Sequence, residues 1–198
     1  TARVRSLVHL LVRLLPAGDS LPLAYLHVCG AQATLIVKAQ RTSIGTMQPL
    51  LDELAGSGLE ALWLHHHPAA GRRLFARSGW QLLWGEPRSL DAHGLQHGPT
   101  AFAQALPGLH RQAMDTARQH LRPEPGRAVL DLYCGSGALA LHLAGHARSV
   151  LGVELDHATL LDAQRSAARN GVSHVAFRAG RAETICERLW KKGQRFPK

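Results

Sequence analysis

One stretch of the chain, residues 128–156, constrains the fold more than any other. It begins with the apolar run AVLDLY, which is typical of a strand buried on both faces of a sheet. Gly135 and Gly137 follow, and glycines allow the tight turn that joins a strand to a helix. A helical segment and a second apolar strand then lead to Glu154. This order predicts a right-handed βαβ crossover and therefore a parallel sheet.

The same alternation continues toward the end of the chain. We expect a helix over residues 108–121 and then three strand–helix units, with strands at 127–134, 149–155 and 174–180 and helices at 137–147, 156–171 and 182–192. The expected fold class is α/β, with residues 99–198 forming part of a Rossmann-like parallel sheet. Since a doubly wound sheet usually contains more units, we expect an exposed strand edge that invites pairing with a second copy of the chain.

Residues 1–98 have a different pattern of helix and strand signals, which predicts a small α+β domain with antiparallel strands. An amphipathic helix ends near Pro16, and two strands flank a turn at Gly30. A short helix with a glycine stop is expected over residues 47–58. Three further strands are expected at 59–67, 72–77 and 80–85, and residues 93–108 form a connector punctuated by glycine and proline.

The charge balance bears on the partner. The chain has 23 lysine and arginine residues against 14 aspartate and glutamate residues, a net charge of +9 that attracts polyanions, nucleic acid above all. Most of the cations are arginines, which also fits a biased coding composition, so charge alone leaves the partner open.

The sequence predicts a cytoplasmic protein without a membrane anchor. Arg5, His9 and Arg13 form a polar stripe on the first helix, which the apolar segment of a signal peptide would not contain. No apolar run is long enough to span a membrane, and the three widely spaced cysteines predict reduced thiols. Because residue 1 is not methionine, we expect a piece of a longer chain.

The glycine loop and the acid that ends the second strand predict a nucleoside site. Asp131 stands just before the loop, and Glu154 lies where a carboxylate accepts hydrogen bonds from ribose hydroxyls. NAD(P) or FAD is one interpretation, but the third glycine of that motif is Ala140 here. S-adenosylmethionine (SAM) is favoured, because it has no phosphate for the acids to repel. A tight turn without a ligand is the third interpretation.

The residues around the loop resemble one family. The segments VLDLYCGSGALALHLA, VLGVELD and ARNG are similar to the RNA uracil-5-methyltransferases, which make 5-methyluridine in tRNA and bacterial ribosomal RNA. DLYCG is the most specific element, and residues 98–121 resemble the family's F-x-Q-x-N segment with its following helix. The resemblance implies a class I SAM-methyltransferase fold, SAM as cofactor and RNA as substrate, with residues 1–98 as the family's central domain.

The resemblance and the loop spacing together single out six residues for cofactor binding: Gln104, Asp131, Tyr133, Gly135, Gly137 and Glu154. The family implies that Gln104 contacts SAM from the connector and that Tyr133 lines the methionine end of the pocket. It also implies that Gly135 lets the backbone approach the cofactor and that Glu154 binds the ribose hydroxyls.

The chain departs from the family pattern in ways that bear on activity. Leu106 replaces an asparagine, Ala138 a polar residue and Arg181 an asparagine or aspartate, which weakens the expected affinity for SAM. The family's nucleophilic cysteine and its general base lie beyond residue 198, and Cys134 in the loop is expected to be a packing residue. We therefore place no catalytic residue in this chain and expect no turnover by it alone; methyl transfer in an assay of these residues would contradict this.

Other functions and other motifs stay open. The chain could be a non-catalytic module that binds SAM or RNA, or a SAM methyltransferase with another substrate. The triplet His65–His67 has no nearby acid, so it predicts a solvent-exposed strand end and no metal site. A basic surface for RNA phosphates, or an exposed charged hairpin, is expected from Arg72, Arg73 and Arg77. Packing within the sheet is expected for Trp63, Trp80 and Trp84.

Overall fold

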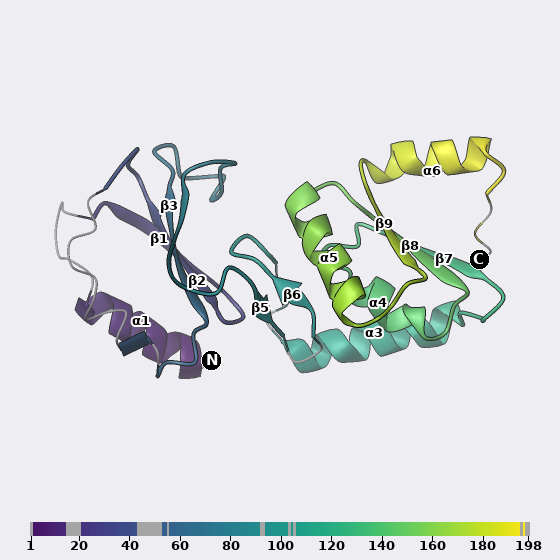
Figure 1. The fold of residues 1–198 in the computed structure, drawn as a ribbon, viewed down its shortest axis with the longest axis horizontal. Helices are drawn as coiled ribbons and strands as arrows, with labels where there is room; N and C mark the ends of the chain where they lie inside the picture. The colour runs from purple at the N-terminus through teal and green to yellow at the C-terminus, as the bar shows by residue number, and fades with distance from the viewer. Residues whose placement is uncertain are drawn as a thin grey trace. The chain divides into compact units, whose positions relative to one another are not determined.

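The structure, a computed structural model, describes residues 2–14, 21–42, 53–54, 56–91, 94–102, 104, 106–194 and 196. The chain folds into two units, residues 1–89 with 98–100 and residues 90–97 with 101–198 (Figure 1). The sequence predicted a division between residues 98 and 99. In this part of the chain, residues 90–97 belong to the second unit and residues 98–100 belong to the first. Most of the expected helix at 47–58 lies outside the described residues.

The first unit is a helix on a four-stranded sheet. Its elements are α1 (Ala2–Leu14), β1 (Leu23–Cys29), β2 (Gln32–Val37), β3 (Ala61–His66) and β4 (Trp80–Gly85), and the strands lie in that order. The β1–β2 hairpin turns at Gly30, which has a φ of 59°, as expected. The two outer strand pairs are antiparallel, whereas β2 and β3 are parallel.

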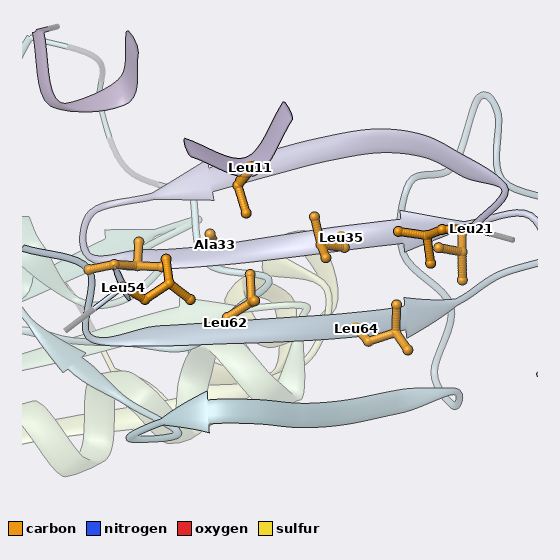
Figure 2. Close-up of a cluster of buried hydrophobic side chains, with 9 residues drawn as sticks. Leu11, Leu21, Ala33, Leu35, Leu54, Leu62 and Leu64 are labelled. Carbon is orange, nitrogen blue, oxygen red and sulfur yellow. The ribbon is translucent and has the colours of Figure 1, made fainter. Parts of the chain in front are cut away.

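Leucines fill the core of this unit on one face of the sheet (Figure 2). Leu11 of α1 points at β2, and Leu35 of β2 and Leu62 of β3 meet it with side chains that are at most 1% exposed. Every residue of β2 is buried, because this strand has a neighbour on each side and is covered on both faces. The opposite face carries polar and aromatic side chains, among them Trp63, whose Nε1 donates to Gln32 Oε1 at 2.6 Å.

Two expectations for this unit are wrong. Residues 72–77 are not a strand: Ala76 N–H donates to the ring of His65, at 2.9 Å, where a strand would need a ladder partner. His65 is not a solvent-exposed strand end, because its side chain is fully buried and stacks on Trp80 with ring centroids 3.9 Å apart. Among the described residues, no three His, Cys, Asp or Glu side chains gather as a metal site would require.

The second unit confirms the predicted strand–helix alternation. A helix, α3 (Pro107–Leu121), precedes a three-stranded parallel sheet of order β7-β8-β9. The remaining elements, in chain order, are β7 (Ala128–Leu132), α4 (Ala138–Ala144), β8 (Ser149–Glu154), α5 (His157–Arg169), β9 (Val175–Ala179) and α6 (Ala182–Lys191). A short two-stranded sheet of β5 (Ser89–Leu90) and β6 (Gln96–His97) precedes α3, and Gln96 N–H donates to Ser166 Oγ of α5 at 2.8 Å.

Helices cover both faces of the parallel sheet, as in a doubly wound fold (Figure 1). Val129 and Val150 pack on α4 on one face, while Leu130 and Val153 pack on α6 on the other. Within the described residues, β7 pairs only with β8, so its second edge carries no strand. Association of two chains through that edge stays a prediction. None of the described helices is both long and apolar enough to cross a membrane.

Gly152, in the central strand of the parallel sheet, allows neighbouring side chains to pack closely against its backbone. A Cβ on Gly152 would lie 2.6 Å from Phe177 Cδ1 and 2.9 Å from Cys134 Sγ. Phe177 also lies against Gly137 in the loop after β7, where an added Cβ would be 2.8 Å from its Cζ. The ring of Phe177 therefore connects the centre of the sheet with the loop at its edge.

We predict that Gly152→Ala destabilises the second unit by about 1–3 kcal/mol, because the new methyl group overpacks this contact. Gly145→Ala is the matched control: its φ is −65° and no heavy atom lies within 4 Å of an added Cβ. Urea unfolding followed by circular dichroism measures both. Equal effects of the two substitutions would contradict the packing account.

Candidate binding site

Three loops meet at the carboxyl ends of β7, β8 and β9, where open α/β sheets bind their ligands. Backbone hydrogen bonds join them: Cys134 N–H donates to Val153 O at 3.0 Å, and Gly180 N–H donates to Glu154 O at 2.9 Å. The loop after β7 and the turn after β9 are therefore both fixed to β8, the central strand.

The carboxylate of Glu154 organises this edge. Its Oε2 accepts from Gly135 N–H at 3.0 Å, and its Oε1 accepts from Leu155 N–H at 2.7 Å and from Asp156 N–H at 2.9 Å. A carboxylate has about four acceptor positions, and three are filled by these bonds. One position remains on Oε2, so Glu154 can accept a ligand hydroxyl without releasing the backbone.

The two loop glycines have different roles. Gly135 has a φ of 55° and no heavy atom within 4 Å of an added Cβ, so the backbone is open on that side. Gly137 has a φ of 83°, donates to Cys134 O at 2.9 Å and is closed off by Phe177. Gly135 thus leaves room for a ligand to approach the backbone, whereas Gly137 makes the turn into α4 close-packed.

Asp131 is a buried acid beneath the loop. Its side chain accepts from Ala140 N–H, and burial raises the pKa of its carboxyl to about 6. Its Oδ2 is buried and has no hydrogen-bond partner among the described residues. A buried carboxylate oxygen without a partner is costly, so the site favours a cation or a hydrogen-bond donor at this point.

Tyr133 crosses from the loop after β7 to the helix after β9. It has a φ of 60°, which is uncommon for a residue with a side chain, and its hydroxyl donates to Glu183 Oε1 at 2.8 Å. The residue is 68% exposed, so it lies at the surface of the site. Sequence reasoning missed Glu183; its place in the first turn after the third strand, at the shared edge of the sheet, was the available signal.

Cys134 is a packing residue in this loop. Its thiol is buried against Gly152, and burial, together with the charges of Asp131 and Glu154, raises its pKa to about 12. At neutral pH the thiolate fraction of such a group is on the order of one in 10⁵, which leaves it inert as a nucleophile.

The remaining sequence-predicted residues lie in the same unit. Gln104 is exposed in the segment before α3, and Leu106 follows it with a side chain that is 64% exposed. Ala138 is the first residue of α4, and Arg181 is the exposed N-terminal cap of α6. Their contacts with a cofactor stay predictions.

Comparisons with known proteins agree with this fold. Residues 123–196 match the family model described as "Methyltransferase domain". The solved structure of Pyrococcus abyssi tRNA (uracil-54, C5)-methyltransferase in complex with S-adenosyl-L-homocysteine superimposes with a TM-score of 0.55 at 18% identity, covering 75% of this chain and 35% of that chain. At this identity the likeness shows the fold alone, and together with the family model it confirms the predicted Rossmann-like fold class.

Sequence relatives confirm the predicted resemblance to RNA uracil-5-methyltransferases. The 23S rRNA (uracil(1939)-C(5))-methyltransferase RlmD of Alkalilimnicola ehrlichii is 36% identical over 61% of this chain and 25% of its own length. The tRNA (uracil-5-)-methyltransferase homolog B of Pongo abelii is 34% identical over 58% of this chain and 24% of its own. An uncharacterized RNA methyltransferase of Lactobacillus johnsonii is 30% identical over 69% of this chain and 31% of its own length. The chain thus spans a third or less of the length of these relatives.

The state of Asp131 gives a prediction of pH dependence. Its pKa is about 6 in the folded chain against an ordinary 3.8, so its contribution to stability is complete below pH 3.8 and is lost as the pH rises through about 6. The loss corresponds to roughly 3 kcal/mol by the linkage relation. We expect Asp131→Asn, which stays neutral, to gain stability relative to the parent over that interval.

Urea unfolding measured from about pH 4 to about pH 8 tests this prediction. The control is Asp156→Asn, which removes an exposed carboxyl but keeps a residue that caps α5 well. The difference between Asp131→Asn and the parent should grow with pH, and by more than the difference between the control and the parent. A flat difference for Asp131→Asn would show that the pKa of Asp131 is not raised in the folded chain.

Proposed function

We propose that the strand-end site of the second unit binds SAM and that the chain is the SAM-binding part of an RNA uracil C5 methyltransferase acting on ribosomal or transfer RNA. The observation that carries the proposal is the free acceptor position on Glu154 Oε2 beside the open side of Gly135. A ribose hydroxyl placed there completes the carboxylate's hydrogen bonds while the nucleoside lies against the loop backbone.

The electrostatics of the site support SAM. Asp131 and Glu154 flank the loop closely enough to raise the pKa of Cys134, so the site is a region of negative potential. SAM carries an ammonium and a sulfonium charge, and the buried Oδ2 of Asp131 offers an acceptor to a cationic group. A dinucleotide would bring phosphates into the same field, which disfavours it.

A vicinal diol is recognised here in one of two ways. Either one hydroxyl takes the free position on Oε2 of Glu154, or Gly135 N–H is released so that both hydroxyls reach the carboxylate. The second way moves the loop, which Gly135 tolerates because its surroundings are open. We propose that Tyr133, held by Glu183, lies along the methionine end and that Gln104 contacts the cofactor from the segment before α3.

The substrate assignment rests on the relatives. Two of them are named as uracil methyltransferases of rRNA and tRNA, and this chain aligns with both over more than half of its length. We infer that the substrate is RNA and the compartment the cytoplasm. Bound SAM supplies the electrophilic methyl group; the residues of the strand-end site bind and orient it, and the loop cysteine, Cys134, does not supply a thiolate for attack on uracil because burial raises its pKa.

Calorimetric titration with S-adenosyl-L-homocysteine tests the proposal on the 198-residue chain. We expect saturable one-to-one binding, and we expect Glu154→Gln to weaken it about tenfold or more, because the substitution removes a charge-assisted hydrogen bond to the ligand. The control is Asp156→Asn, which removes a carboxylate two residues away and should change the affinity less than threefold.

Two results would overturn the assignment. Absence of binding to the parent chain would do so, as would NAD⁺ binding more tightly than the nucleoside ligand. Equal weakening by Glu154→Gln and Asp156→Asn would show that net charge at this edge, and not the carboxylate of Glu154, governs affinity.

A further inference from the structure

The first unit has a basic edge. Because β2 and β3 are parallel, the segments that follow them leave the sheet at the same end. These segments are residues 38–42 and 67–79. Thr42 joins the first segment to the end of β3: its N–H and its hydroxyl lie 3.2 and 3.0 Å from His66 Nε2. We define the basic edge by its exposed cations, which are Lys38, Arg41, Arg72, Arg73 and Arg77.

Acidic side chains do not offset this charge. Residues 38–42 and 66–79 contain no aspartate or glutamate, and none of the five cations forms an ion pair within the described residues. Glu60 and Glu86 lie at the other end of the sheet, where Glu86 N–H donates to Glu60 O at 3.0 Å. Glu53 is paired with Arg13, and Asp19 and Asp52 lie outside the described residues. The described part of the unit is therefore polarised, with one strongly positive end.

The loop that carries the three arginines is anchored from beneath by His65. The ring Nε2 accepts from Ala76 N–H at 2.9 Å, so the proton is on Nδ1, which donates to Gly79 O at 3.3 Å. The ring stacks on Trp80 at an interplanar angle of 14°, and Phe75 packs edge-on against His27. Burial lowers the pKa of His65, which keeps the ring neutral and both hydrogen bonds intact.

This anchoring prepares the edge for a ligand. The backbone from 67 to 79 is held at Arg73 O by His67 Nε2, at 3.0 Å, and at Ala76 and Gly79 by His65, while the arginine side chains remain in solvent. A cationic loop whose backbone is already ordered loses less conformational entropy on binding than a flexible one. Arginine is also the side chain best suited to bidentate contact with phosphate oxygens.

We propose that this basic edge binds the phosphodiester backbone of RNA. The proposal rests on the proposed function for its choice of RNA among polyanions, and it adds a binding surface in the unit that does not contain the SAM site. Contacts to phosphates fix the position of the nucleic acid and carry no sequence information, so DNA of the same sequence binds through the same cations.

The experiment measures the affinity of the 198-residue chain for a single-stranded RNA of about 20 nucleotides between about 50 and 200 mM salt. The test variant is Arg72→Ala/Arg73→Ala/Arg77→Ala. The matched control, Arg127→Ala/Arg148→Ala/Arg169→Ala, removes the same charge from exposed positions at the amino-terminal end of the parallel sheet. Titration of each protein with S-adenosyl-L-homocysteine is run beside it.

We expect the test variant to bind RNA at least tenfold more weakly and its salt slope to fall by about two, since each phosphate contact on a single strand contributes about 0.7. The control should lose less than threefold. No RNA binding by the parent chain, or equal losses for both variants, would overturn the proposal. Because the cofactor titration reports on the other unit, a chain that binds the cofactor but fails these criteria refutes the basic edge alone, whereas loss of cofactor binding in the parent refutes the proposed function.

Discussion

The carboxylate of Glu154 is the interaction on which the strand-end site depends. It accepts hydrogen bonds from three backbone N–H groups that belong to two loops. The bond to Gly135 holds the loop after β7 against the end of β8, which keeps one side of that glycine open. The same loop covers Asp131, and burial raises the pKa of its carboxyl.

Both units use one polar side chain at a strand end to hold a loop. In the second unit Glu154 ends β8 and accepts from one backbone N–H of the glycine loop, that of Gly135. In the first unit His65 lies near the end of β3 and binds the backbone at Ala76 and Gly79. The loop of the basic edge presents three arginines, whereas the acids at the cofactor edge, Asp131 and Glu154, belong to the strands β7 and β8. The two surfaces therefore suit ligands of opposite charge.

The sequence predicted the second unit well, because buried parallel strands and amphipathic helices leave a local periodicity that can be counted. It also placed Asp131, Gly135 and Glu154 at one edge, since the carboxyl ends of parallel strands meet there. It failed in the first unit, where the strand predicted at 72–77 is a loop and the parallel pairing of β2 and β3 was not foreseen. These features depend on contacts between distant residues, such as His65 with Ala76, which no local pattern records.

We propose that the loops after β7, β8 and β9 form one nucleoside site arranged around Glu154. The most direct test is an amide ¹H–¹⁵N spectrum of the labelled chain titrated with S-adenosyl-L-homocysteine. We expect the largest shifts on the amides of residues 133–137, 154–156 and 180–183, and the largest of all on Gly135, because its N–H shares the carboxylate with the ligand. Saturable shifts confined to other residues, or no shifts at all, would contradict it.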